Sequence, residues 1–265
     1  MNTLLGRLIV YVNTCLKKDV NYTIAQYIIE NYVDCENITL KLVCEKCYIS
    51  RASIIRFCEL FGFSSWTSFH QLLTRMKRVK EKQMKDRVSH LVLDDLYQQL
   101  KRITNCTGEG VMDGIKRDVK IVVKAIHESK KVFLFGSLYP LSIATSFQTD
   151  MAAIGKVIYS DFERNEYQVG LMKEDDLAII VTVTGRYIIE AKKKFNSICH
   201  SPATRMLISC SNQFAGLQSI DYFIHIKAKN QNTIKIYDYF LMAFLDIVYV
   251  TYYQQYMGEI EYARA

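Results

Sequence analysis

Hydroxyl groups and a glycine lie where a strand-forming run meets a helical pattern, in the segment AIIVTVTGRYIIEA at residues 178–191. Thr182 and Thr184 offer hydroxyl donors, Gly185 permits a close approach of the backbone, and Arg186 carries a positive charge. Hydroxyls and free amides between a strand and a helix are what a phosphate pocket needs. The segment therefore predicts an anion-binding loop, although an arginine in a first helical turn is more often a solvated surface residue.

The elements that must position this loop alternate between strands and helices from Lys130 onward. Apolar strands are predicted at 130–136, 156–160, 176–183, 204–210 and 221–227, and the longer helices between them at 137–154, 162–172 and 186–198. This alternation indicates a parallel sheet covered on both faces, and right-handed crossovers give five strands a doubly wound, flavodoxin-like order. Ligands of such sheets bind outside the carboxyl ends of the strands.

That edge of the sheet brings a second loop into the predicted site, because the first strand ends at Gly136. The candidate effector-binding residues from the two loops are Gly136, Ser137, Thr182, Thr184, Gly185 and Arg186. Two amphipathic helices are expected before the sheet, within residues 91–129, around a break at NCTGEG (105–110).

The positive charge lies almost entirely in the first third of the chain. Residues 1–90 hold 14 Lys+Arg against 8 Asp+Glu, which is +6 of the total formal charge of +7. This region has helical periodicity, and two short helices are predicted at 40–47 and from Arg51 to about Phe61, with Thr39 and Ser50 as N-caps and Gly62 as the stop. A basic helical unit before a neutral one suggests a head that binds a polyanion.

The turn between these short helices is Tyr48-Ile49-Ser50, which gives the pair helix-turn-helix proportions. The second helix presents the candidate DNA-binding residues, which are Ser50, Arg51, Ser53 and Arg56. Arginine suits guanine edges and phosphates, and serine suits phosphates or either class of base. An ordinary helical hairpin with solvated arginines would show the same spacing.

The segment ISRASIIRFCELFGFSSWTSFHQLL resembles the N-terminal signature of the RpiR-type bacterial transcription regulators. The residues that carry the resemblance are Ser50, Ala52, Ser53, Ile54, Arg56, Phe57, Phe61-Gly62 and Phe69, and IAQYIIENYVD at 24–34 is similar to the family's preceding helix. The resemblance covers about the first 75 residues and implies a winged-type helix-turn-helix domain that binds operator DNA as a dimer.

The later part of the chain resembles the sugar isomerase (SIS) domain, the usual partner of such a head. In that family the third-strand loop reads Ser-X-Ser-Gly-X-Thr/Ser and holds a sugar phosphate; Thr182, Thr184 and Gly185 match it and Tyr187 departs. The first-strand loop departs further, because Leu138 and Pro140 stand where the family favours a glycine and a serine. The resemblance leaves three possibilities open: a different phosphorylated ligand, weak binding, or no binding.

Three further features could take part in binding: a basic segment, a pair of cysteines and an aromatic-rich segment. Arg75 to Arg87 holds seven positive and two negative residues, which is most often a solvated face but beside a DNA-binding head can touch phosphates. Cys44 and Cys47 form a single CxxC, for which buried thiols are a better explanation than zinc. The aromatic-rich segment 232–257 predicts a buried helix that suits a subunit interface, although the chain's own core can absorb several of its rings.

The sequence thus predicts a multi-domain α and α/β protein: a helix-turn-helix domain at 1–78, a helical linker at 79–105, and a flavodoxin-like, five-stranded SIS domain at 106–265. We expect a cytoplasmic transcription regulator of carbohydrate-metabolism genes, without a cofactor, metal or membrane span, that binds operator DNA and a sugar phosphate as a homodimer or higher homo-oligomer. An SIS-type phosphosugar isomerase is one alternative, although His127, His200, His225 and Glu190 lie in no catalytic sequence context. A regulator with a decayed effector pocket is the other.

Overall fold

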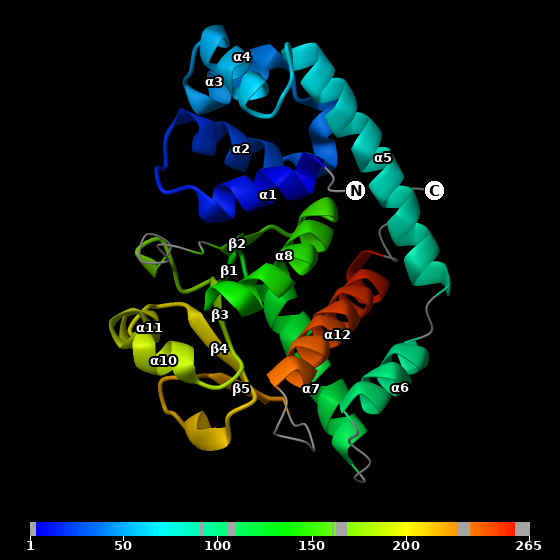
Figure 1. Ribbon diagram of the computed structural model, residues 1–265, viewed down its shortest axis with the longest axis vertical. Helices are drawn as coiled ribbons and strands as arrows, with labels where there is room; N and C mark the ends of the chain where they lie inside the picture. Colours follow the sequence, from blue (N-terminus) through cyan, green and yellow to red (C-terminus); the bar gives the residue numbers. More distant parts are fainter. Residues whose placement is uncertain are drawn as a thin grey trace. The chain divides into compact units, whose positions relative to one another are not determined.

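The computed structural model describes residues 4–90, 93–104, 110–160, 162, 169–226 and 234–257 (Figure 1). Its contacts divide the chain into two compact units. The first comprises Met1–Arg87 with Gln148–Val157, and the second comprises Val88–Phe147 with Ile158–Ala265. Helix α8 (Leu138–Ala153) therefore begins in the second unit and ends in the first.

The first unit is helical throughout its described residues, so the strands of the wing that the resemblance implies are not found among them. Its elements are α1 (Leu4–Thr14), α2 (Val20–Glu30), the 3-10 helix η1 (Tyr32–Asn37), α3 (Leu40–Cys47), α4 (Arg51–Leu60) and α5 (Trp66–His90). Polar side chains cap three of these helices at their first turn: Asp19 accepts from the amides of Asn21 and Tyr22, Thr39 from that of Leu42, and Ser50 from that of Ser53. Such caps satisfy amides that have no partner inside the helix.

The end of α4 is a Schellman motif, as the Phe61-Gly62 pair predicts. The amide of Phe63 donates to the carbonyl of Cys58 and the amide of Gly62 donates to the carbonyl of Glu59. Gly62 has φ +85°, a conformation that side chains disfavour. Beneath this turn the rings of Phe57, Phe61, Phe63, Trp66 and Phe69 form one cluster, with centroids 5.0–6.3 Å apart. The cluster fixes α4 on α5.

The basic segment on α5 is partly structural. Lys77 is buried and pairs with Glu36 at 2.6 Å, while Lys80 and Arg87 both pair with the buried carboxylate of Asp150. Arg75, Arg78 and Lys82 have exposed side chains. The predicted solvated face is therefore only partly correct, because Lys77, Lys80 and Arg87, three of the seven cations in 75–87, form ion pairs within the unit.

The second unit contains the predicted parallel sheet, with strands β1 (Val132–Gly136), β2 (Ile158–Ser160), β3 (Leu177–Thr182), β4 (Thr204–Ser209) and β5 (Tyr222–His225). All pairings are parallel and the strand order is β2-β1-β3-β4-β5, so the flavodoxin-like fold class is confirmed. Helices α6 (Leu93–Thr104) and α7 (Val111–Glu128) precede the sheet, also as predicted.

Helices cover both faces of this sheet (Figure 1). One face packs Phe133, Phe135, Ala178 and Ile180 against α10 (Arg186–Glu190) and α11 (Lys192–Cys199). On the other side lie α7 and α12 (Ile234–Tyr252), which contacts both α6 and α7. Most aromatic residues of α12 are buried in the chain's own core, whereas Tyr239 is 55% exposed and Met242 is 53% exposed.

One predicted helix is wrong in its continuity. Residues 186–198 form two short helices, because Ala191 leaves helical geometry at φ −101° and ψ 35° and separates α10 from α11. A five-residue α10 sums few peptide dipoles, so the helix contributes little to anion binding after the threonine loop. The helix predicted at 162–172 and the break at 105–110 fall largely outside the described residues.

The described part of the chain bears on two further expectations, which concern a membrane span and a metal site. None of its helices combines the length and the apolar character that a membrane crossing requires. Cys44 and Cys47 are free thiols, and burial raises the pKa of Cys47 to about 11, which disfavours the thiolate that zinc binds. No group of three or more His, Cys, Asp or Glu side chains suited to a metal ion occurs among the residues described.

Replacing Asp150 with alanine is expected to lower the free energy of unfolding by about 2–3 kcal/mol, because Lys80 and Arg87 would lose the buried carboxylate that they share. Glu45→Ala is the control. It removes a carboxylate from the exposed pair with Lys41 in the same unit and should cost less than about 0.5 kcal/mol. Urea denaturation monitored by circular dichroism measures both, and equal effects would contradict a structural role for Asp150.

Candidate functional sites

The first candidate site is the helix-turn-helix formed by α3 and α4. The two helices are separated by the predicted turn at 48–50, and both contact α2. Tyr48 closes α3 in the left-handed conformation at φ 56°, where glycine or asparagine is usual, and its side chain is 94% exposed. The turn sharply redirects the chain, and α4 starts directly after it.

The four predicted DNA-binding residues differ in how free their polar groups are. Arg51 and Arg56 have exposed side chains, whereas Ile54, Phe57 and Cys58 of α4 are buried, on the face opposite Arg56. The hydroxyl of Ser50 accepts from the Ser53 amide at 3.2 Å, and the two serine hydroxyls lie 3.1 Å apart. The serines thus already serve the helix cap, which leaves the arginines as the groups presented to a nucleic acid.

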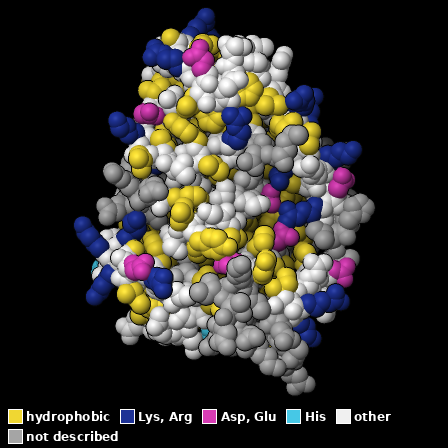
Figure 2. Space-filling view, in the orientation of Figure 1, with side chains coloured by type: hydrophobic (Ala, Val, Ile, Leu, Met, Phe, Trp, Pro, Cys, Tyr) yellow, Lys and Arg dark blue, Asp and Glu magenta, His cyan; other side chains and the backbone are white. Residues whose placement is uncertain are grey.

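Basic side chains are dispersed in the view of Figure 2 instead of gathering into one continuous patch. Three of the fourteen Lys and Arg residues in 1–90, Lys77, Lys80 and Arg87, pair with carboxylates of the same unit. The exposed cations of this unit include Arg51 and Arg56 of α4 and Arg75, Arg78 and Lys82 of α5.

The second candidate site is a hollow of about 260 Å³ at the carboxyl edge of the sheet. Strands β1 and β3 are paired directly, with Gly136 opposite Val181, so the loops that follow them meet. Four of the six predicted effector residues line the hollow: Ser137, Thr182, Thr184 and Arg186. The sequence prediction that both loops share one edge is therefore matched by their positions; whether they bind an anion stays a prediction.

The two threonines of the hollow occupy different environments. Thr182 is the last residue of β3 and is 3% exposed. Thr184 is exposed, and its hydroxyl accepts from the amide of Arg186 at 3.4 Å. Arg186 itself is 77% exposed and pairs with Glu190 across one helical turn, at 3.7 Å. The arginine charge therefore lies at the rim of the hollow and is already balanced.

The two glycines of the predicted site, Gly136 and Gly185, are required by close packing. A Cβ on Gly136 would lie 2.6 Å from the carbonyl oxygen of Val181. Gly185 has φ +79°, and a Cβ there would lie 2.2 Å from the Phe214 ring. Neither glycine lines the hollow. Packing alone therefore accounts for the glycine of the Thr-X-Thr-Gly match. The groups of this motif that line the hollow are the side chains of Thr182 and Thr184.

The departures from the SIS pattern have structural consequences. Pro140 lies in the first turn of α8 and lines the hollow without an amide N–H, so the turn offers one donor fewer. Tyr187 is 8% exposed and packs its ring into the core under α10 while lining the same hollow. The hydroxyl of Ser142 donates to the carbonyl of Leu138 and is directed away from ligand binding.

One lining residue was missed by the sequence analysis. Asp238, in the second turn of α12, is 8% exposed, and its Oδ1 atom has no hydrogen-bond partner among the described residues. Burial raises the pKa of Asp238 above its ordinary value, and a hydrogen bond from the Tyr139 hydroxyl partly opposes this. An acidic residue within the apolar run IYDYFLMAFL was the available signal.

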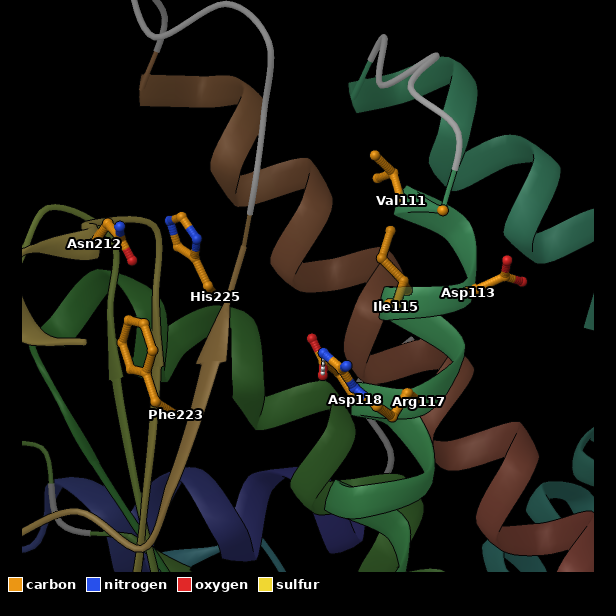
Figure 3. A pocket seen from close by; sticks show the side chains of 10 residues that line it. Val111, Asp113, Ile115, Arg117, Asp118, Asn212, Phe223 and His225 are labelled. Atoms are coloured by element: carbon orange, nitrogen blue, oxygen red, sulfur yellow. Dashed lines mark hydrogen bonds and ion pairs between the residues drawn. The ribbon is translucent and has the colours of Figure 1, made fainter. Parts of the chain in front are cut away.

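A larger hollow of about 730 Å³ lies between α7 and the end of β5 (Figure 3). Arg117 and Asp118 of α7 form an ion pair at 3.5 Å, and the His225 ring stacks on Phe223 and contacts the carbonyl of Cys210. None of the predicted effector residues lines it. The segments 105–109 and 227–233, which adjoin it in sequence, lie outside the described residues.

No family model matches this chain. The chain is similar to the HTH-type transcriptional regulator GlvR of Bacillus subtilis (strain 168), with 23% identity over 172 residues. The predicted resemblance to RpiR-type regulators is confirmed. The match covers 63% of this chain and 62% of GlvR, so it spans less than two thirds of that regulator's length.

Solved structures with the RpiR-type arrangement also resemble this chain, at low identity. The NanR protein of Vibrio vulnificus complexed with ManNAc-6P has a TM-score of 0.47 and 14% identity, with coverage of 96% of this chain and 94% of NanR. The sugar isomerase domain of an RpiR transcription factor from Sphaerobacter thermophilus has a TM-score of 0.45 and 14% identity, covering 66% of this chain and 97% of that one.

Replacing Gly185 with alanine is expected to destabilise the protein whether or not a ligand binds. Gly216→Ala is the matched control, since Gly216 also has a positive φ of +83° but a Cβ there meets nothing within 4 Å. The control should cost about 1–2 kcal/mol from backbone strain alone, and Gly185→Ala about 1–3 kcal/mol more, because Phe214 must move. Chemical denaturation of the two variants gives the difference, and equal costs would refute the packing explanation.

Proposed function

We propose that this protein is a DNA-binding transcription regulator of carbohydrate-metabolism genes whose activity is controlled by a sugar phosphate. The observation that carries the proposal is the capped helix-turn-helix of α3 and α4, together with the similarity to an HTH-type transcriptional regulator over 172 residues. The helix-turn-helix domain at 1–78 binds operator DNA, the helices at 79–105 act as a linker, and the SIS-like domain at 106–265 holds the effector.

DNA recognition is assigned to α4. Arg56 projects from the helix face opposite its buried residues and Arg51 is exposed in the first turn, so both are accessible on a helix proposed to enter the major groove. The serines at its start hold the helix end, and the exposed cations of α5 add phosphate contacts. Because such contacts release counter-ions from DNA, affinity falls steeply with salt concentration.

Effector control is assigned to the hollow at the carboxyl edge of the sheet. Ser137, Thr182 and Thr184 line this hollow, and their hydroxyls are the donors proposed for a phosphate. A sugar phosphate regulates DNA binding if it has different affinities for the DNA-competent and DNA-incompetent arrangements. We further propose a cytoplasmic homodimer or higher homo-oligomer, with the exposed Tyr239 and Met242 of α12 at a subunit contact.

An SIS-type phosphosugar isomerase is the second candidate, and Asp238 is the observation that favours it. A buried carboxylate with a raised pKa inside a pocket is suited to act as a general base. His127, His200 and His225 do not line this hollow. Proton NMR of purified protein with hexose 6-phosphates in deuterated water tests the candidate, because isomerisation exchanges the proton on the carbon next to the carbonyl. Turnover would replace the regulator proposal for this domain.

Replacing Arg56 with alanine is expected to weaken binding to the operator by about 1–3 kcal/mol, roughly 5- to 150-fold, because a base or phosphate contact is lost. Fluorescence anisotropy with DNA from upstream of the protein's own gene, at fixed salt, gives the affinity. Lys193→Ala removes an equal charge from the exposed surface of α11 and should leave the affinity within about twofold. Unchanged binding by Arg56→Ala would remove that residue from the interface.

Thr182→Val is expected to abolish the thermal stabilisation that a sugar phosphate gives the wild-type protein, because the buried hydroxyl is a phosphate donor while the two side chains are similar in size. Ser197→Ala, on α11 outside the hollow, is the control and should retain the stabilisation. Differential scanning fluorimetry against a panel of hexose and pentose phosphates makes the measurement. Absence of a dose-dependent shift for wild-type protein with every compound would favour the decayed pocket.

A further inference from the structure

The deepest charge in the hollow at the carboxyl edge is negative. Asp238 is buried, whereas the other two charged residues that line the hollow, Arg186 and Glu190, are 77% and 70% exposed at the side chain and pair with each other. The formal charge of the lining side chains is thus −1, located where solvent reaches least. A phosphate alone would meet this charge unfavourably, so the ligand must bring something that compensates it.

The carboxylate is also incompletely satisfied by the protein. Oδ1 of Asp238 has no hydrogen-bond partner among the described residues, although buried oxygens of this kind nearly always have one. Among the described residues, the Tyr139 hydroxyl is the group that favours the charged form of Asp238, and the pKa of the Cys210 thiol is raised to about 12 by burial and by Asp238. Because Asp238 lines the hollow, a donor that enters meets this residue, and a bond to Oδ1, which is itself inaccessible to solvent, requires the side chain to turn.

Resting on the proposed function, we infer that Asp238 makes this hollow selective for a sugar phosphate that carries an ammonium group. The volume of about 260 Å³ limits the ligand to a small molecule of monosaccharide size. The phosphate meets the hydroxyls of Ser137, Thr182 and Thr184, and the ammonium meets the Asp238 carboxylate. A charge-assisted hydrogen bond inside a desolvated pocket is stronger than one from a neutral hydroxyl, which gives the amino sugar its advantage.

The same residue should reduce the stability of the empty protein. At pH 7 the charged form of a carboxylate with a raised native pKa is less favourable in the folded than in the unfolded chain, so removing the charge stabilises. Asp238→Asn should therefore raise the melting temperature of the ligand-free protein at pH 7, and the gain should shrink as the pH falls toward the pKa of Asp238. A lower melting temperature at pH 7 would overturn the assignment of an uncompensated charge.

Isothermal titration calorimetry with full-length protein tests the selectivity. The probes are glucosamine, galactosamine and mannosamine 6-phosphates, each against the hexose 6-phosphate that differs only by a hydroxyl in place of the amine. Wild-type protein should bind at least one amino sugar phosphate about tenfold or more tightly than its hexose partner, and Asp238→Asn should reduce that ratio to about one to three. The N-acetyl derivatives, which lack the charge, should lose the advantage.

Glu190→Gln is the matched variant, because it removes the same charge from the exposed rim. It should change affinity for both sugars of a pair by one common factor and leave their ratio intact. Equal affinity of wild-type protein for amino and plain sugar phosphates, or a preference that survives Asp238→Asn, would overturn the inference while leaving the phosphosugar proposal standing. No binding of any sugar phosphate would instead overturn the proposed effector site itself.

Discussion

The parallel pairing of β1 with β3 is the constraint on which the candidate effector site depends. It places Gly136 opposite Val181 and so brings two loops, separated by more than forty residues of sequence, to one edge of the sheet. The contact is close enough that a Cβ on Gly136 would lie 2.6 Å from the Val181 carbonyl oxygen. This register places Thr182 at the end of β3 beside the loop that carries Ser137 and Pro140, while Asp238 reaches the hollow from α12.

The helical first unit is organised by local chemistry and a compact aromatic core. Thr39 and Ser50 start the two short helices, and the Schellman turn at Gly62 ends the second. Each of these residues lies within a few positions of the helix end that it forms, so the helix ends can be predicted from the sequence. The internal ion pairs of α5 are a different matter, since Asp150 comes from a helix far along the sequence.

The hollow and the loop beside it contain one residue that the fold requires, Gly185, and one that costs stability, Asp238. Gly185 is required by its backbone angle and by Phe214, so its agreement with a phosphate-loop pattern says little about binding. Asp238 is the reverse case, because a buried and incompletely satisfied carboxylate costs stability. Residues that break the rules of a well-packed core are expected at functional sites. The Thr-X-Thr-Gly motif alone could not distinguish a binding loop from a packing requirement, because its glycine is needed by the fold and Asp238 lies outside the motif.

The sequence by itself determined the element types, the parallel sheet with its strand order, the helix-turn-helix with its caps, and the meeting of the two loops. These follow from periodicity, capping residues and the handedness of crossovers, all of which act locally or obey general rules. Only the tertiary structure decided that Ala191 divides the helix after β3, that Lys77, Lys80 and Arg87 are internal partners, and that Asp238 enters the hollow. Each of these depends on which distant side chains become neighbours, and residue spacing along one chain carries no such information.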